Sequence, residues 1–375
     1  MGAQTLLFGV PGRAAFDEIG GIRMELETIL SGAVNRGVSD IFIVPGAPVT
    51  LKIKGEMIPA SDERVMPADT ETLLRGIYEL AQQRDMRRLL ETGDDDFSFS
   101  VRGVGRFRCN AFKQRGSLAA VLRVVVFGLP DPVELNIPQQ VIDLYKVRRG
   151  MVLVTGPAGS GKSTTLVCII DRINREFRDH IVTIEDPIEY LHAHNNSIVS
   201  QREIDHDTSS YAQALRAALR QAPNVILLGE MRDYETISTA LTAAETGHAL
   251  FSTLHTVGAA KTIDRIIDVF PANQQQQTRI QLSMVLKAVV SQQLIPTVDG
   301  SLVPAFEVMI VNSAVQNMIR EGKVHQLDNV IYGGQTQGMM TMDGEIFRLY
   351  REGRISRENA VLYSLNAEQM RKRLM

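Results

Sequence analysis

A short glycine-rich segment, "GPAGSGKST" at residues 156–164, carries the residue types that bind phosphate. It matches the pattern G-x-x-x-x-G-K-[ST] at Gly156, Gly161, Lys162 and Ser163. Glycines allow backbone N–H groups to close around phosphate oxygens, lysine brings a point charge to the β- and γ-phosphates, and a hydroxyl can bind Mg²⁺. The expected nucleotide-binding residues are Gly156, Pro157, Ala158, Gly159, Ser160, Gly161, Lys162, Ser163 and Thr164. The segment therefore predicts a site for a nucleoside triphosphate, with Ser163 at Mg²⁺.

The neighbours of this segment are those that a phosphate loop requires. An apolar strand at residues 151–155 precedes it, and an apolar helix beginning "STTLVCIIDRI" follows it. The N-terminus of such a helix adds its positive dipole end to the phosphate site. The sequence has no NKxD-like guanine signature, which favours ATP over GTP.

Hydrolysis of ATP also needs a carboxylate to position the attacking water and acidic help with Mg²⁺. Two further strands end in candidates: Glu230 in "NVILLGEMRD" and Glu185 in "IVTIEDPIEY". The usual Walker B pattern has an Asp before the Glu, and Gly229 occupies that place here. Glu185 is the natural supplier of the missing acid. Both glutamates could instead be solvated strand ends, and that alternative stays open.

A fourth strand, "GHALFSTLHT", ends at His255. A lone histidine is more often structural than catalytic, so both interpretations remain open for His255 on the residues alone. We interpret His192, His194 and His206 as solvated loop residues, because no carboxylate or cysteine spacing around them demands a metal.

The composition is that of an ordinary globular protein, with 44% hydrophobic and 22% charged residues and a net charge of −3. No basic surplus suggests nucleic acid, so none is expected as a partner. The two cysteines, Cys109 and Cys168, form no CxxC pair, which indicates neither a zinc cluster nor a disulfide framework and suggests the reducing cytosol. No apolar stretch approaches the roughly 18 to 20 residues needed to cross a bilayer.

Residues 23–127 read as a small α+β domain behind a loosely ordered tail at residues 1–22. Helices are expected over 23–36, 68–83 and 84–91, and an antiparallel pair in "SDIFIVPGAPVTLKIKGEMI". Three more strands are "DFSFSV", "GRFRCNAF" and "SLAAVLRVVV". In the second of them Phe107, Cys109 and Ala111 should face one way, and Arg106 and Arg108 the other.

Residues 128–140 carry three prolines and break both periodicities, which predicts a linker or hinge. Residues 141–375 then alternate apolar strands with helices, as in a parallel sheet with its carboxyl edge facing a ligand. A later strand is expected at 303–310, and a helical tail from 312 with Asn312 and Ser356 as N-caps. The expected fold class is α/β.

The four blocks "GPAGSGKST", "TIEDPIEY", "VILLGEMRD" and "GHALFSTLHT" look like the Walker A, Asp box, atypical Walker B and His box of secretion-type ATPases. Within that superfamily the chain resembles the PilT-like retraction motors of type IV pili. "SDIFIV" and "GRFRCNAFKQRG" near the N-terminus, and "AVQNMIREGKVHQL" and "GMMTMDGEI" near the C-terminus, extend the likeness over roughly residues 23–365. The longer N-terminal region and CxxC…CxxC zinc site of the assembly ATPases are missing.

The resemblance implies a homohexameric ring of subunits, each with a PAS-like N-terminal domain and a RecA-like ATPase domain. It implies that Glu230 is the catalytic base or water positioner, Glu185 the Mg²⁺-associated acid and His255 a γ-phosphate sensor. Arginines of the N-terminal domain would complete the site: the best matches are Arg108 and Arg123, with Arg106 and Arg115 as rivals. Exposed strand arginines without such a role are the alternative.

The family further implies a cytoplasmic motor at the inner membrane that acts on a pilus platform protein and works with other pilus ATPases. Two alternatives remain: an accessory subunit that binds ATP but hydrolyses it negligibly, and a translocase ATPase of the same superfamily. "AVQNMIRE" differs at three positions from the family's usual "AIRNLIRE". That helix is linked to retraction in the family, so the direction of action rests on analogy.

Overall fold

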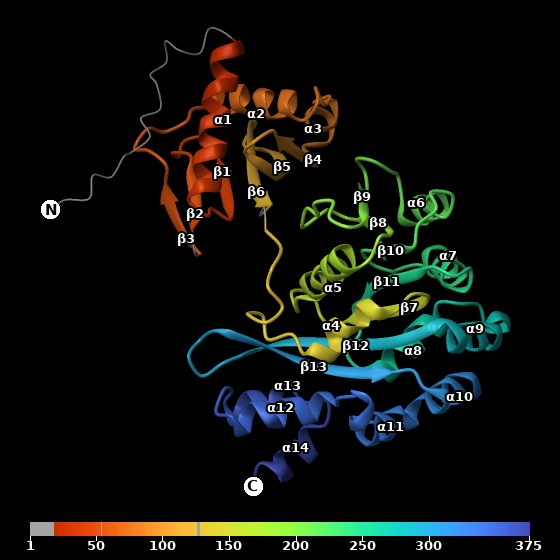
Figure 1. Ribbon diagram of the computed structural model, residues 1–375. Helices are drawn as coiled ribbons and strands as arrows, with labels where there is room; N and C mark the ends of the chain where they lie inside the picture. Colours follow the sequence, from red (N-terminus) through yellow and green to blue (C-terminus); the bar gives the residue numbers. More distant parts are fainter. Residues whose placement is uncertain (1–18, 54, 126–127) are drawn as a thin grey trace. The chain divides into compact units, whose positions relative to one another are not determined.

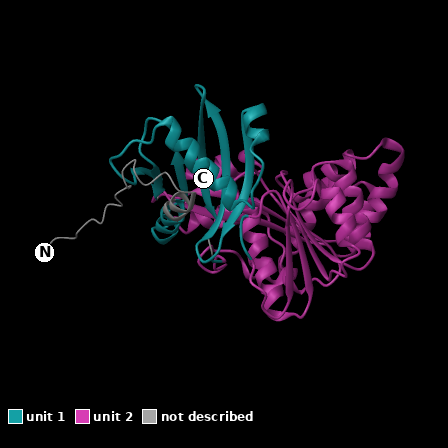
Figure 2. Cartoon of the chain, turned by 90° about the horizontal axis from the view of Figure 1, so that it is seen from above, with its two compact units in different colours: residues 1–128, 189–191 teal, residues 129–188, 192–375 magenta. Residues whose placement is uncertain are grey.

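The computed structural model of the chain describes residues 19–53, 55–125 and 128–375. Of the tail expected at residues 1–22, residues 1–18 lie outside this described part. The chain divides into two compact units, shown in different colours in Figure 2. The first unit is Met1–Gly128 with Glu189–Leu191, and the second is Leu129–Ile188 with His192–Met375. Residues 129–140 thus belong to the second unit, where Ile137 is buried.

The first unit is built on a six-stranded antiparallel sheet with the order β3-β2-β1-β6-β5-β4. Its strands are β1 (Asp40–Ile43), β2 (Thr50–Ile53), β3 (Glu56–Pro59), β4 (Asp94–Val101), β5 (Gly105–Gln114) and β6 (Ser117–Val125). Its helices are α1 (Ile19–Asn35), α2 (Pro67–Leu80) and α3 (Arg87–Thr92). This is the α+β unit that the sequence predicts (Figure 1).

All three helices contribute to one hydrophobic core against the sheet. Leu30 of α1, Ile77 of α2 and Leu89 of α3 are fully buried with Phe107 and Leu122. Along β5 the alternation holds as expected, because Phe107, Cys109 and Ala111 are fully buried while Arg106 and Arg108 are partly exposed. Burial of one face leaves the polar side chains of β5 and β6 on the opposite face of the sheet.

The second unit is built on a seven-stranded sheet with the order β13-β12-β7-β11-β10-β8-β9. Neighbouring strands are parallel except for the antiparallel pair of β12 and β13. The strands are β7 (Gly150–Thr155), β8 (His180–Glu185), β9 (Ile198–Glu203), β10 (Val225–Leu228), β11 (Ala249–Leu254), β12 (Leu286–Pro296) and β13 (Leu302–Ile310). Every residue of β7, β10 and β11 is buried, as expected for parallel strands covered on both faces.

Helices cover both faces of this sheet (Figure 1). One face packs against α4 (Gln139–Ile142) and α5 (Lys162–Glu176). The other packs against α6 (Tyr211–Ala218), α7 (Tyr234–Glu245), α8 (Ala259–Asp268), α9 (Ala272–Val285), α10 (Ser313–Glu321) and α11 (Leu327–Gly333). Helices α12 (Met342–Arg351), α13 (Arg357–Tyr363) and α14 (Ala367–Arg373) form a further cluster on the hairpin of β12 and β13.

The two N-caps predicted in the helical tail are present: Asn312 caps α10 and Ser356 caps α13. Asn312 Oδ1 accepts a hydrogen bond from the N–H of Val315 at 3.0 Å, and Ser356 Oγ accepts one from Asn359 at 3.1 Å. No helix among residues 19–375, as far as the structure describes them, is long and apolar enough to span a membrane.

Three strands were not expected from the sequence. The segment predicted as an antiparallel pair contains a third strand, β3, which pairs with β2. β9 lies in a polar stretch without the usual apolar run. β12 follows α9 directly, with Leu286 closing the helix and no glycine or proline between Ala272 and Pro296. Without such a breaker, the apolar residues of 286–290 continue the helical pattern of residues 282–285, and only pairing with β7 and β13 makes 286–290 a strand.

Candidate active site

The phosphate loop is the turn from β7 into α5, and its glycines adopt backbone angles that other residues avoid. The φ angles of Gly156, Gly159 and Gly161 are 144°, 74° and 86°. Gly161 is the N-cap of α5, and no side chain caps that helix end. The N-terminus of α5 therefore lies at the loop, where the helix dipole favours a negative charge.

The loop rests on β12 through a close approach to Gln292. A Cβ atom at Gly156 would stand 2.1 Å from the carbonyl oxygen of Gln292, so only glycine fits. The Gln292 side chain, 3% exposed, lies against Gly161, and its Oε1 accepts a 2.7 Å hydrogen bond from Thr165 Oγ1. Gln292 thus supports the phosphate loop from the β12 side. The sequence did not reveal this role, because β12 itself was not expected.

The charged and hydroxyl groups of the loop lie where a phosphate group would need them. Lys162 Nζ donates to the carbonyl oxygens of Gly156 at 3.0 Å and Pro157 at 2.9 Å, which holds the ammonium over the loop. Ser163, the second residue of α5, is exposed. The loop residues fit a triphosphate: a cradle that only glycine permits, an uncapped helix end and an ammonium group.

Glu185 ends β8 and is almost buried. Its Oε1 accepts hydrogen bonds from Thr183 Oγ1 at 2.6 Å and from Gln201 Nε2 at 3.3 Å. The described residues contain no group of three or more His, Cys, Asp or Glu side chains that could hold a metal. Mg²⁺ commonly takes one or two carboxylates together with substrate phosphates and water, so an ion bound with the triphosphate would not require such a group.

The place of the usual Walker B Asp, at Gly229, offers little room for a side chain. Gly229 follows β10 and lies beside the end of β8, bonding its N–H to Ile184 at 2.8 Å. A Cβ atom there would stand 2.9 Å from Tyr211 Oη and 3.4 Å from the Cα of Glu185. Glu185 therefore lies directly beside the place of the missing acid. Burial raises the pKa of Tyr211, and the negative charges of Glu230, Asp186 and Glu185 add to this effect.

Glu230 and His255 interact across two neighbouring strand ends. Glu230 Oε2 lies 3.2 Å from His255 Nε2, and Glu230 Oε1 lies 2.7 Å from Arg232 Nε. The Glu230 side chain is 12% exposed, whereas those of His255 and Arg232 are 48% and 71% exposed. The glutamate is thus shielded and held on both oxygens, while the histidine faces solvent.

Backbone and side-chain bonds hold these two strand ends together. The N–H of Met231 donates to the carbonyl of Thr253 at 3.1 Å, and Thr253 Oγ1 donates to the carbonyl of Gly229 at 2.7 Å. Strands β7, β11, β10 and β8 are consecutive and parallel, and they end at the phosphate loop, His255, Glu230 and Glu185 respectively. The fold therefore brings all four predicted blocks to one edge of the sheet.

The predicted arginines lie in the first unit, on the sheet face away from its core. Arg108 on β5 and Arg123 on β6 are directly opposite each other in the ladder. Two facing arginines repel unless each has a counter-charge. Arg108 forms two bonds with Asp96, at 2.6 and 3.1 Å, and Arg123 Nε lies 3.1 Å from Asp40.

The two rival arginines have different surroundings. Arg106 Nη1 donates to Ser100 Oγ at 3.4 Å on the same sheet face as Arg108. Arg115 lies at φ 49° in the two-residue turn between β5 and β6, followed by Gly116 at φ 80°. A hairpin turn with two positive φ angles projects Arg115 from the end of the sheet.

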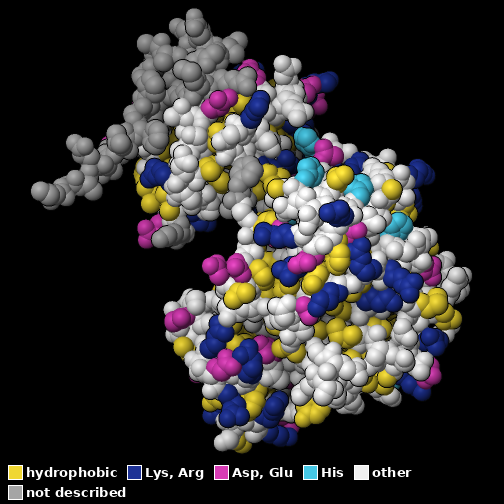
Figure 3. Space-filling view, viewed as in Figure 1, with side chains coloured by type: hydrophobic (Ala, Val, Ile, Leu, Met, Phe, Trp, Pro, Cys, Tyr) yellow, Lys and Arg dark blue, Asp and Glu magenta, His cyan; other side chains and the backbone are white. Residues whose placement is uncertain are grey.

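One of the three loop histidines was misjudged from the sequence. Histidine side chains gather at the surface over the part of the second unit that carries β8 and β9 (Figure 3). His192, however, is only 8% exposed, and burial lowers its pKa to about 4. The sequence shows a polar neighbourhood, and only the folded chain shows that this segment packs against the helix α5 through Asn174, which donates to Ala193 at 2.8 Å.

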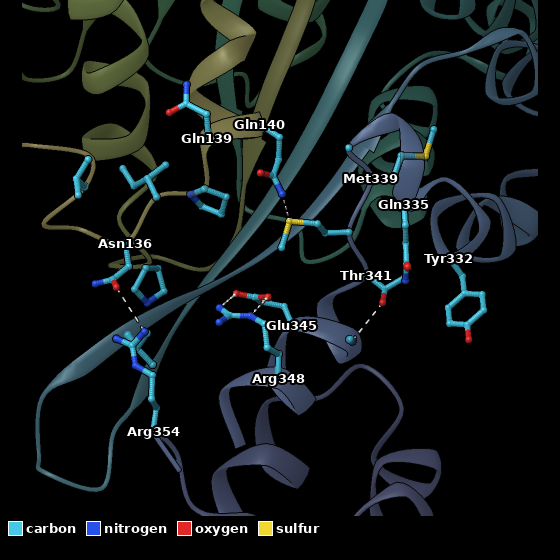
Figure 4. Close-up of a pocket in the computed structure, with 18 of the residues that line it drawn as sticks. Asn136, Gln139, Gln140, Tyr332, Gln335, Met339, Thr341, Glu345, Arg348 and Arg354 are labelled. Carbon is cyan, nitrogen blue, oxygen red and sulfur yellow. Dashed lines mark hydrogen bonds and ion pairs between the residues drawn. The ribbon is translucent and has the colours of Figure 1, made fainter. Parts of the chain in front are cut away.

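A pocket of roughly 900 Å³ opens elsewhere in the second unit (Figure 4). It is bounded by residues 133–140, the start of β13 and residues 332–354, including Thr341, Glu345 and Arg348 of the α12 region. No residue of the phosphate loop and none of Glu185, Glu230 and His255 lines it. The chemistry predicted from the motifs therefore belongs to the strand ends and not to this pocket.

Comparison with known proteins places the chain in a family. A family model described as "Type II/IV secretion system protein" matches residues 130–370. The chain is 44% identical to the "Type IV pilus retractation ATPase PilT" of Pseudomonas aeruginosa, covering 90% of this chain and 97% of that protein. It is 40% identical to the "Type IV pilus ATPase PilU" of the same organism, covering 93% and 91%.

A solved structure supports the same assignment. The crystal structure of the pilus retraction motor PilT with bound ADP is 47% identical, has a TM-score of 0.84 and covers 92% of this chain and 98% of that one. The chain therefore belongs to the type II/IV secretion system protein family and, within it, to the PilT-like pilus retraction ATPases.

Proposed function

We propose that this chain hydrolyses Mg²⁺-bound ATP in a homohexameric ring at the cytoplasmic face of the inner membrane. The ring would power retraction of a type IV pilus through a membrane platform protein. One observation supports the catalytic part above all others. Lys162, His255, Glu230 and Glu185 follow or end four consecutive parallel strands at one edge of the sheet.

Each of these groups has a task that its surroundings suit. Lys162 neutralises charge on the β- and γ-phosphates. Ser163 and Glu185 would hold Mg²⁺, which would offset the charge of the phosphate oxygens. Glu230, shielded from solvent and bonded on both oxygens, orients the attacking water. His255, which contacts Glu230 and is half exposed, senses the γ-phosphate and holds the carboxylate in place.

Arg108 and Arg123 would complete a site from another subunit of the ring. Both are paired with aspartates of their own sheet, so an incoming triphosphate would replace Asp96 and Asp40 as the partner. For Arg108 and Asp96, whose side chains are 38% and 41% exposed, the exchange costs little, because exposed ion pairs typically contribute about 0–1 kcal/mol. Asp40 is buried, so the exchange at Arg123 costs more. An arginine that stabilises the transferred phosphoryl group contributes roughly 10³- to 10⁵-fold in rate.

ATP turnover per subunit, measured against protein concentration, tests the shared site. We expect turnover to rise steeply with concentration and to collapse in Arg108→Ala. The matched control is Arg75→Ala, which removes an exposed arginine that pairs with Glu71 on α2 of the same unit. Flat turnover, equal in the parent and in Arg108→Ala, would mean that each subunit works alone and would overturn the ring proposal.

The second candidate is an accessory pilus ATPase, favoured by the 40% identity to PilU over 349 residues. The two roles can be distinguished by expressing this protein in a pilus-bearing host that lacks its own retraction ATPases. A self-sufficient motor restores twitching when supplied alone, whereas an accessory subunit restores it only together with a second ATPase.

A further inference from the structure

Hydrogen bonds at Thr256, Gly258 and Ala259 hold the segment that follows His255 and leads into α8. The hydroxyls of Thr256 and Thr262 hydrogen-bond at 2.8 Å, and Thr262 Oγ1 also bonds the carbonyl of Gly258 at 2.8 Å. Thr262 is fully buried on α8. Since only three residues separate His255 from the helix, the position of α8 determines where the imidazole can lie relative to Glu230.

Two side chains from β12 and β13 receive the backbone N–H groups at this helix start. Ser291 Oγ accepts from the N–H of Gly258 at 2.9 Å, and Glu307 Oε1 accepts from the N–H of Ala259 at 2.8 Å. Ser291 and Glu307 are direct partners in the β12–β13 ladder, and Ser291 is also the partner of Thr155, the last residue of β7. Both acceptors are buried, Ser291 at 0% and Glu307 at 3% exposure.

The second oxygen of Glu307 reaches another helix. Glu307 Oε2 lies 3.5 Å from the N–H of Met342, the first residue of α12. Beside it, Val308 and Met340 exchange two backbone bonds of 2.8 and 2.9 Å, which fixes the chain entering α12 against β13. The start of α12, with Thr341 and Glu345, is drawn in Figure 4. One carboxylate therefore accepts from the N-termini of two ten-residue helices.

Burial of the Glu307 carboxylate costs free energy, but an uncharged glutamine could not make the same two hydrogen bonds. Burial raises the pKa of Glu307, as do the nearby charges of Asp328 and Asp343, while the N–H groups of Ala259 and Met342 oppose the rise. Two N–H donors need two acceptor oxygens, and a glutamine offers only one. Its amide NH₂ would face the second N–H group, so an unsatisfied buried donor would remain.

We propose that Glu307 is a positioning residue for ATP hydrolysis. Through Ala259 and Met342 it fixes the start of α8, and with it the short loop that holds His255 against Glu230. Ser291 assists by receiving the N–H of Gly258. This inference rests on the proposed role of His255 and adds a residue outside the four motifs to the machinery.

The first test is steady-state ATP hydrolysis by the full-length Glu307→Gln variant. We expect kcat to fall about 10- to 100-fold, because small misplacements of a catalytic group have effects of that size. The KM for ATP should change less than about twofold, since the phosphate loop is not touched. The control is Glu345→Gln, which alters another buried carboxylate of the α12 region that pairs with Arg348. An unchanged kcat in Glu307→Gln, or an equal fall in both variants, would overturn the proposal.

A double-mutant cycle with His255→Ala separates positioning from general damage. If Glu307 acts through His255, Glu307→Gln should cause almost no further loss of kcat once His255 is alanine. Losses that multiply in the double variant would mean that Glu307 acts elsewhere and would reject the proposal. If His255→Ala alone leaves kcat unchanged, the proposed role of His255 fails first, so the two failures are distinguishable.

A second variant guards against loss of folding. Ser291→Ala removes the acceptor of the Gly258 N–H and keeps the charge of Glu307. If Glu307→Gln does not fold, Ser291→Ala takes its place in the cycle with the same requirement: a fall in kcat that disappears in the His255→Ala background. Unchanged or multiplicative kinetics for Ser291→Ala would then count against the proposal.

Discussion

Gly229 lies beside Glu185 at the ends of two adjacent parallel strands, and a Cβ atom at Gly229 would be 3.3 Å from the carbonyl oxygen of Ile184 and in van der Waals contact, at 3.4 Å, with the Cα of Glu185. Tyr211 Oη would be closer still, at 2.9 Å. The hydroxyl of Tyr211 thus occupies the place that the side chain of the usual Walker B Asp would enter, β8 borders that place, and Glu185 brings its own carboxylate to the same edge of the sheet.

An Asp at position 229, as in the usual Walker B pattern, should therefore lower both the stability and the ATP turnover of this protein. We expect Gly229→Ala to lower the free energy of unfolding by about 1–3 kcal/mol through overpacking, and Gly229→Asp to lower it more and to reduce ATP turnover. Tyr211→Phe removes the nearest atom and should recover part of the loss in Gly229→Ala. Urea unfolding and ATP turnover are the measurements. A Gly229→Asp variant as stable and active as the parent would show that crowding is not the reason for the glycine.

Glu230→Gln should separate binding from hydrolysis. The amide keeps the size of the side chain but cannot act as a base, so ATP affinity should persist while turnover falls by about 10²- to 10⁴-fold. Equilibrium binding of a fluorescent ATP analogue and phosphate release measure the two properties. Glu235→Gln is the control, because Glu235 is an exposed carboxylate on α7 that pairs with Arg216. Undiminished hydrolysis in Glu230→Gln would remove Glu230 from the catalytic role.

Gln292→Ala should destabilise the phosphate loop by removing its support from β12. Thr165 Oγ1 would lose its buried acceptor, which costs about 1–3 kcal/mol in stability, and the loop would lose the contact at Gly161. We expect the KM for ATP to rise. Gln293→Ala serves as the comparison, since its amide bonds the carbonyl of Tyr363 away from the loop. An equal KM for ATP in Gln292→Ala and Gln293→Ala would contradict a specific role for Gln292.

The free energy of unfolding should fall in acid, because the buried His192 is neutral in the folded protein. Its folded pKa of about 4 lies below the ordinary value near 6.5, so the unfolded chain takes up the proton first. The contribution of neutral His192 is complete above pH 6.5 and is lost as the pH falls towards 4, about 2–3 kcal/mol in all.

Urea unfolding between pH 7 and pH 4 measures this loss. His192→Gln should flatten the profile in that window, whereas substitution of the exposed His325 should leave it as steep as in the parent. A parent and a His192→Gln variant with parallel profiles would show that His192 remains solvated or paired.

Contiguous motifs were enough to locate the phosphate loop, Glu185, Glu230 and His255, because each lies at the end of an apolar strand within a few residues of its own signature. The alternation of β5 likewise predicted the buried Phe107 and the outward Arg108. These features depend on local chemistry and on the two periodicities of helix and strand, which a single sequence displays.

Gln292, Ser291, Glu307 and Tyr211 could not be found in this way. Their roles arise from neighbours far away in the chain, as with Thr165 and Gln292, which are 127 positions apart, and β12 has no local signal that separates it from α9. The burial of His192 also depends on packing against a distant helix. Long-range strand pairing decides which side chains support the site, and no short segment carries that information.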